Sequence, residues 1–239
     1  MSASEVLAGV RAQLAQVSAW PGGEPRAAPW PGLIVVVAGV AVGVAAWLCG
    51  RGMLAIGVAP AIAGVVAIVA AVLFGAAVIE RGMAGAFDRW LGTRWAPLAT
   101  GGTLLLRVVA LWSTAPALWW AAVIVPAGAG RLAAVALQRL GDVAPAPRGR
   151  SFVLRGVSAV ELVAACAVIA ALAVAASGGS GLAVLGVAAA IAVVLGLALE
   201  MGEGELAADS LAVAAAAVEL AVAVGFAAVA PAVRSPFVG

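Results

Sequence analysis

Residues 181–199 read GLAVLGVAAAIAVVLGLAL, an apolar run without a charged side chain. A transmembrane helix needs about 20 such residues, whereas a membrane-spanning strand alternates apolar and polar residues over about ten. The rest of the chain is similar: 65% of its 239 residues are hydrophobic, 10% are charged and the mean hydropathy is +1.19. A soluble domain carries about 25% charged residues. The sequence therefore predicts an all-α, polytopic membrane helix bundle.

The apolar runs divide into about seven predicted spans, which together form a single transmembrane domain over residues 32–239. These spans are Gly32–Cys49, Leu54–Ile79, Ala99–Ala115, Ala117–Gln138, Val157–Ala176, Gly181–Leu199 and Ser210–Ala232. Arg51, Pro116 and the stretch 177–180 mark three short turns. The longer predicted connections are 80–98, 139–156 and 200–209.

The N-terminal segment, residues 1–31, has a different pattern. Its apolar residues recur at helical spacing, and they are Val6, Leu7, Val10, Leu14 and Val17. No basic region followed by an apolar core occurs there, so the segment does not have the pattern of a signal peptide. The spacing predicts an amphipathic helix that lies in the membrane interface and ends before Pro21.

The arginines predict the orientation of the bundle. With a break at Pro116, only Arg51 and Arg234 fall on one side of the membrane. The other side receives Arg11, Arg26, Arg81, Arg89, Arg94, Arg139, Arg148, Arg150 and Arg155. All acidic loop residues fall on this second side too, and an excess of arginine marks the cytoplasm. We therefore expect a multi-pass inner-membrane protein, in contact with membrane lipid, whose polar loops and N-terminus are cytoplasmic.

Four charged residues lie inside the predicted spans: Arg107, Arg131, Glu161 and Glu219. At a rise of about 1.5 Å per residue, all four fall in the cytoplasmic half of the membrane. Isolated charges are costly there, so we expect them to face the bundle interior, either paired or lining a wet cavity. For Arg107 and Glu161, snorkelling of the side chain to the interface is an equal alternative.

The composition excludes several chemistries. The chain has no His, Lys, Asn or Tyr, which removes lysine Schiff bases and histidine-ligated zinc or haem. No basic stripe with interleaved aromatics is present, so a nucleic-acid partner is not expected. Cys49 and Cys166 stand singly within apolar runs, as small buried residues do.

Several short motifs follow one another in a suggestive order. Residues 29–33 read PWPGL before the first span, and residues 79–89 read IERGMAGAFDR at the end of the second. Gly101-Gly102 precedes the run that carries Arg107, and Gly130 precedes Arg131. Residues 207–212 read AADSLA before the last span. This order resembles the cobalamin-5-phosphate synthases, also called adenosylcobinamide-GDP ribazoletransferases.

The family's acidic signature reads roughly His-Leu-Asp-Gly-Leu-Ala-Asp-Thr-x-Asp-Gly, and its last helix follows Thr-Gly-Asp-Thr-Leu-Gly. Gly82, Ala84 and Asp88 match the first motif, and Asp209 matches the aspartate of the second. The resemblance implies a membrane transferase of the last steps of cobalamin biosynthesis. Such an enzyme joins α-ribazole or its 5-phosphate to a corrinoid nucleotide, GDP-activated cobinamide, and releases GMP with the help of Mg²⁺.

Asp88 and Asp209 are accordingly the candidate catalytic residues and magnesium ligands. Glu80 is a third candidate ligand, because it lies about two helical turns before Asp88. The candidate substrate-binding residues are Arg81, Arg107, Arg131 and Glu219. Asp209 also reads as a helix N-cap, because it directly precedes the last apolar run.

The sequence departs from the family signature at two metal-ligand positions. Arg81 and Gly85 replace two of its aspartates, and the cation at Arg81 would lower the affinity for magnesium. Arg81, Arg89 and Arg94 can instead bind a diphosphate without metal, through bidentate hydrogen bonds. The alternative is that these arginines are topology determinants that contact lipid headgroups.

Two other functions remain open at this stage. A non-catalytic relative of the family would bind a corrinoid, a lipid or a partner protein, and the loss of two metal ligands motivates that hypothesis. A small transporter would use the intramembrane charges as a relay. Transport needs polar groups that are reachable from both sides of the membrane, whereas the predicted bundle has almost no polar groups on one side.

Overall fold

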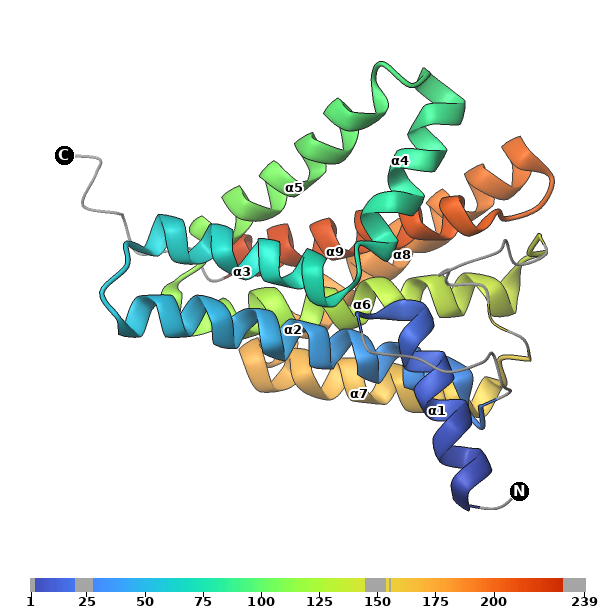
Figure 1. Cartoon of the computed structure of the whole chain (residues 1–239), viewed down its shortest axis with the longest axis horizontal. Helices are drawn as coiled ribbons and strands as arrows, with labels where there is room; N and C mark the ends of the chain where they lie inside the picture. The colour runs from blue at the N-terminus through green and yellow to red at the C-terminus, as the bar shows by residue number, and fades with distance from the viewer. Residues whose placement is uncertain (1–2, 20–27, 145–153, 155, 230–239) are drawn as a thin grey trace.

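The computed structural model describes the chain except residues 1–2, 20–27, 145–153, 155 and 230–239 (Figure 1). The described part is helical, with no strand among its named elements. The helices are α1 Ala3–Val17, α2 Pro31–Ala55, α3 Pro60–Phe74, α4 Val78–Leu91, α5 Ala96–Trp112, η1 Pro116–Leu118, α6 Trp119–Leu140, α7 Ala159–Ser177, α8 Gly179–Glu203 and α9 Ala208–Val229. The predicted all-α class is confirmed.

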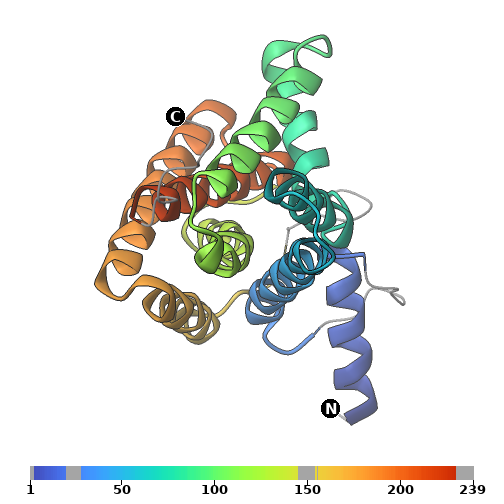
Figure 2. The same cartoon turned by 90° about the vertical axis from the view of Figure 1, so that its left-hand side faces the viewer.

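Helix α6 lies at the centre of the bundle, and the other long helices pack around it (Figure 2). It is buried over most of its length because small residues let its neighbours approach closely. A Cβ at Gly43 of α2 would lie 2.7 Å from Ile124 Cα, and one at Gly128 would lie 2.4 Å from Ile169 Cδ1 on α7. The glycines of α2 and α6 thus determine how tightly α6 is enclosed.

Five of the described helices are long and apolar enough to cross a membrane: α2, α7, α8, α9 and α6 with the preceding η1. The pair α3 and α4 passes the same test together and would make a sixth span. Helix α5 is apolar but shorter, with 17 residues. These seven units correspond in order to the predicted spans.

The second predicted span, Leu54–Ile79, is not one straight helix. Helix α3 ends at Phe74, and α4 continues after a bend of 83°. Gly75 caps α3, and Ala76 and Ala77 then adopt left-handed backbone angles, with φ of 54° and 52°. Much of the predicted connection 80–98 is consequently helical, because α4 runs on to Leu91. Helix α4 is amphipathic and more polar than α3, which suits a helix that bends away from the axis of an apolar span.

Several other predicted boundaries were also wrong by part of a turn or more, among them the start of the second span, since α3 begins at Pro60. Helix α2 continues through Arg51 to Ala55, and α8 continues through Glu200 to Glu203. Positive-φ glycines follow both ends, Gly57 at 84° and Gly204 at 82°, which is how helices commonly stop. Asp209 lies in the first turn of α9, which begins at Ala208, and is not its N-cap.

The predicted helix near the N-terminus is present as α1, and it packs against α2 with Ala12 and Val17 buried. The N–H of Ala19 donates to the carbonyl of Phe74 at 2.7 Å, which joins the end of α1 to the end of α3. The N-terminal landmarks Pro21 and Arg26 lie outside the described residues, as do Arg148, Arg150, Arg155 and Arg234.

The two ends of the bundle differ in the number of charged residues that they carry. The ends of α4, α6 and α8 lie at the same end of the bundle as α1 and the starts of α2, α5, α7 and α9 (Figure 1). In the part of the chain that the structure describes, the opposite end carries one charged side chain, Arg51. The break at Pro116 is confirmed, since α5 and α6 run in different directions on either side of it. We call the charged end the polar end.

Candidate functional site

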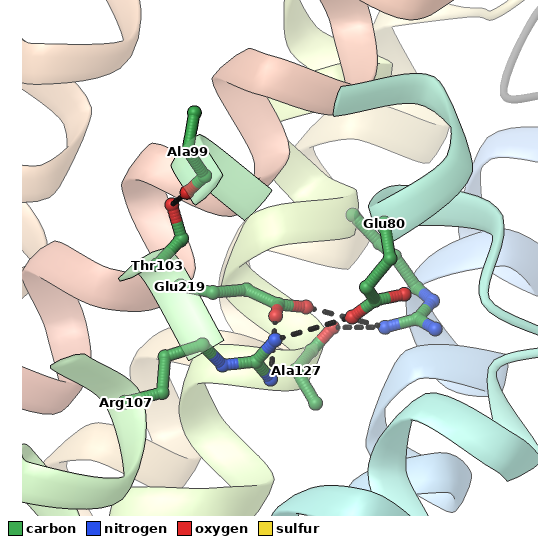
Figure 3. Close-up of polar contacts among 7 residues, drawn as sticks. Glu80, Ala99, Thr103, Arg107, Ala127 and Glu219 are labelled. Carbon is green, nitrogen blue, oxygen red and sulfur yellow. Dashed lines mark hydrogen bonds and ion pairs between the residues drawn. The ribbon is translucent and has the colours of Figure 1, made fainter. Parts of the chain in front are cut away.

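Four charged side chains from four helices meet inside the bundle: Glu80 on α4, Arg107 on α5, Arg131 on α6 and Glu219 on α9 (Figure 3). We call them the charge cluster. Arg107 Nη2 lies 2.8 Å from Glu219 Oε2, and Arg107 Nη1 lies 3.5 Å from Glu80 Oε1. Arg131 Nη1 lies 3.5 Å from Glu219 Oε1 and donates to the carbonyl of Ala127 at 2.8 Å.

The charge cluster is almost closed to solvent. Relative exposure is 8% for Arg107, 2% for Arg131 and 1% for Glu219. Two positive and two negative groups neutralise one another, as buried charges in a membrane protein require. The expectation that Arg107, Arg131 and Glu219 pair in the bundle interior is confirmed, and Arg107 does not snorkel to the interface.

Glycines make room for these long side chains. A Cβ at Gly130 would lie 2.4 Å from Glu219 Cγ, and one at Gly39 would lie 2.5 Å from Arg131 Cδ. At Gly75, directly before the left-handed alanines, it would lie 3.2 Å from Arg131 Nη2. The bend between α3 and α4 is therefore part of the wall around the charge cluster.

The free space inside the cluster is small. A cavity of about 10 Å³, lined by all four charged residues, has room for one water molecule. Arg131 Nε and Glu219 Oε2 make no hydrogen bond, although the latter is ion-paired with Arg107. One water bonded to such atoms would satisfy them. In this conformation the space does not admit a phosphate group.

A second group of polar residues lies at the polar end, where α4, α8 and α9 meet. Arg89 pairs with Asp209 at 2.5 Å and with Glu203 at 3.5 Å. Trp90 Nε1 donates to Glu203 Oε1 at 3.1 Å, and the Ser210 hydroxyl donates to Glu203 Oε2. We call these five residues the outer cluster. Its arginine is well exposed, with 44% of the side chain accessible, so solvent screens these pairs.

The two segments that carry the family resemblance lie against each other at the outer cluster. A Cβ at Gly85 would lie 2.7 Å from Asp209 Oδ2, and one at Gly82 would lie 2.3 Å from Cβ of Ala212. The signature helix α4 thus packs on the first turns of α9 through its glycines. Asp88, one turn after Gly85, is exposed and has no ion pair with any described residue.

The three predicted magnesium ligands are not gathered at one point. Glu80 belongs to the charge cluster through Arg107, whereas Asp209 belongs to the outer cluster through Arg89. Among the residues that the structure describes, no three Asp, Glu, Cys or His side chains form a group that could hold a metal ion. Arg81 points back along α4, where it donates to the carbonyls of Ala76 and Ala77.

Glu161 has a different position from the other intramembrane charges. Its side chain forms a capping box with Ser158 at the start of α7 and accepts the N–H of Gly32 at 2.8 Å. Relative exposure of Glu161 is 4%, so its side chain does not snorkel to the interface, and its partners lie outside the charge cluster. The spacing Ser-x-x-Glu at 158–161 was the one available sequence signal for the capping box.

Three residues of the outer cluster were not predicted from the sequence: Trp90, Glu203 and Ser210. Nothing in the local sequence pattern indicates that the end of α8 lies beside α4.

The chain was compared with models of known protein families, with curated proteins and with solved structures, and none of them matches it.

Proposed function

We propose that the protein is a membrane transferase of the cobamide-synthase type, which joins α-ribazole or its 5-phosphate to GDP-activated cobinamide and releases GMP at the polar end. The observation that supports this proposal is the contact between Gly85 of α4 and Asp209 of α9. These two segments are distant in sequence and carry the two acidic motifs of the resemblance. An enzyme of this kind needs both motifs at one site.

Asp88 and Asp209 are the acidic residues of the proposed site. Magnesium in proteins commonly uses one or two carboxylates and completes its shell with substrate phosphates and water. Asp88, which is exposed one turn after Gly85, and Asp209, which lies against Gly85, fit that pattern. Glu80 does not, since Arg107 neutralises it inside the bundle. A bound Mg²⁺ would neutralise charge on the phosphoryl oxygens of the substrate.

The arginines have separate proposed roles. Arg89 lies nearest Asp209 and presents its guanidinium to solvent, so it can bind a substrate phosphate in place of its carboxylate partners. Arg81, bonded to the carbonyls at the start of α4, stabilises the bend. Arg107, Arg131 and Glu219 reach a substrate only if the charge cluster opens, because each guanidinium already has a carboxylate partner.

The ion pair between Arg89 and Asp209 favours a second candidate, a non-catalytic relative that binds the corrinoid nucleotide without transfer. A metal ligand held by an arginine is available to a cation only after that pair breaks. The two candidates make the same prediction for binding and different predictions for GMP release.

A titration of the detergent-purified protein with GDP-activated cobinamide tests both candidates. Corrinoid absorbance reports binding, and GMP release after addition of α-ribazole and Mg²⁺ reports transfer. We expect binding and release, and we expect Asp88→Asn to abolish release while binding persists. Asp142→Asn, at an exposed position outside both clusters, is the matched control. Binding without release supports the non-catalytic candidate, and absence of binding overturns both.

We further propose that the protein lies in the inner membrane with its polar end in the cytoplasm, since arginine-rich loops are retained there. A cysteine-free variant with one new cysteine at Glu205 or at Ala115 tests this orientation. A membrane-impermeant maleimide added to intact cells should label the Ala115→Cys variant and spare the Glu205→Cys variant. The reverse pattern would invert the proposed topology.

A further inference from the structure

An apolar groove lies between α6, α7, α8 and α9, and it shares no residue with the cavity of the charge cluster. Its volume is about 360 Å³, within the range of about 300–1,000 Å³ that is typical of ligand sites. Leu140, Cys166, Ile169, Gly186 and Val193 are among its lining residues, none of which is charged. Figure 2 shows α7 and α8 at the edge of the bundle, on the outer side of α6.

We propose that this groove binds one acyl chain of an anionic phospholipid from the surrounding bilayer, with the lipid phosphate at Arg139. This site is independent of the proposed transferase activity. It predicts a lipid held by the protein at a fixed position, in contrast to the exchanging lipids that surround any membrane protein.

The position of the groove argues for a hydrocarbon occupant. All four of its helices are among the candidate spans, so the groove lies at the depth of the lipid tails. Water would find no hydrogen-bond partners on this lining, and cavities of that kind stay dry or take up apolar ligands. From Ala129 to Leu140 the groove follows α6 for about 16 Å, a length that suits an extended chain.

The end of the groove argues for an anionic headgroup. Leu140 lines the groove at the last residue of α6 and is 72% exposed, which places the mouth at the polar end. Arg139 precedes it, is exposed, and has no ion pair with another described residue. A guanidinium at the membrane surface binds lipid phosphate through charge-assisted hydrogen bonds.

Glycines of α8 provide a matched pair of substitutions. Gly186 lines the groove, and a Cβ added there would meet no atom within 4 Å, so Gly186→Leu adds an apolar side chain at the groove wall with no clash at its Cβ. Gly202 is on the same helix, has equal space around it and does not line the groove. Gly202→Leu therefore controls for the helix propensity and hydrophobicity of the new leucine.

The test uses nanodiscs that contain phosphatidylglycerol with a photoreactive diazirine on its acyl chain. We expect cross-links to concentrate on groove residues of α6, α7 and α8, to fall at least five-fold in Gly186→Leu, and to persist in Gly202→Leu. Cross-links spread evenly over the lipid-facing helices, or unchanged in Gly186→Leu, would overturn the proposal. Circular dichroism and size-exclusion chromatography establish that both variants are folded.

The headgroup is tested with Arg139→Gln. Native mass spectrometry of protein taken from mixed phosphatidylglycerol and phosphatidylcholine should show retained phosphatidylglycerol for the wild type. We expect the variant to retain the two lipids in proportion to their abundance. An unchanged preference for phosphatidylglycerol in Arg139→Gln would contradict the assignment of the phosphate to Arg139.

Discussion

Arg107 on α5 and Glu219 on α9 face each other at 2.8 Å, and both side chains are more than nine-tenths buried. Glu219 also pairs with Arg131, and Arg107 also pairs with Glu80. A chain of three ion-pair contacts thus connects α4, α5, α6 and α9. Removal of any one member leaves a charge without its partner in a medium that solvates it poorly.

The first prediction concerns Glu219. Glu219→Gln should lower the free energy of unfolding by about 3–5 kcal/mol, because both buried arginines lose their closest carboxylate. Denaturant unfolding in detergent, followed by tryptophan fluorescence, measures the change. The exposed Glu205→Gln is the control. Equal midpoints for the two variants would contradict the structural importance of the cluster.

The second prediction concerns the glycine beside Glu219. A Cβ at Gly130 would lie 2.7 Å from the carbonyl of Ala215 as well as 2.4 Å from Glu219 Cγ. Gly130→Ala should therefore destabilise the protein by about 1–3 kcal/mol, in spite of the higher helix propensity of alanine. Gly186→Ala, where the added carbon meets open space, should be neutral or slightly stabilising. A more stable Gly130→Ala variant would show that α6 and α9 can separate at little cost.

The third prediction concerns the bend between α3 and α4. Ala77 has a φ of 52°, a left-handed conformation that costs about 1–2 kcal/mol for an L-residue with a side chain. Ala77→Gly should relieve that cost and raise the unfolding midpoint. Ala70→Gly, in the regular part of α3, should lower it by about 1 kcal/mol. Equal destabilisation of both variants would show that the left-handed backbone conformation of Ala77 carries no strain.

The fourth prediction concerns the availability of Asp209. Arg89→Gln should raise the affinity for a divalent cation up to about five-fold, because an exposed pair contributes at most about 1 kcal/mol that a metal must overcome. Mn²⁺ titration followed by electron paramagnetic resonance measures the affinity directly. Arg139→Gln removes one positive charge elsewhere at the polar end and serves as the control. Equal effects of the two variants would indicate a general change in charge and not release of Asp209.

The all-α class was predictable because the run 181–199 and the other long apolar runs exceed the length of a membrane-spanning strand. The pairing of Arg107, Arg131 and Glu219 was predictable from the cost of a charge in hydrocarbon. The bend after Phe74 was not, since Gly75-Ala76-Ala77-Val78-Ile79 continues the apolar run and alanine rarely adopts left-handed angles. Sequence periodicity carries no information about such a local backbone state.

The outer cluster was only partly predictable. Asp88 and Asp209 were predicted to bind one magnesium ion, which requires the two motifs to lie together, and Asp209 does lie against Gly85 of α4. Its pairing with Arg89 depends on the angle between α4 and α9, which follows from the contact of Gly82 with Ala212 and from the bend itself. The position of Glu203 depends in turn on α8 continuing beyond Leu199 to Glu203. Each of these is a tertiary relationship that no single segment specifies.

The nearly bare end of the bundle has a consequence for biosynthesis. The links between α2 and α3 and between α7 and α8 are short, and Arg51 is the charged residue that stands beside them in the described chain. If the polar end stays on the side of synthesis, each of these helix pairs can enter the bilayer as a hairpin. For these two hairpins the insertion machinery then moves one guanidinium, that of Arg51, across the hydrocarbon layer, which keeps the energetic barrier to their insertion low.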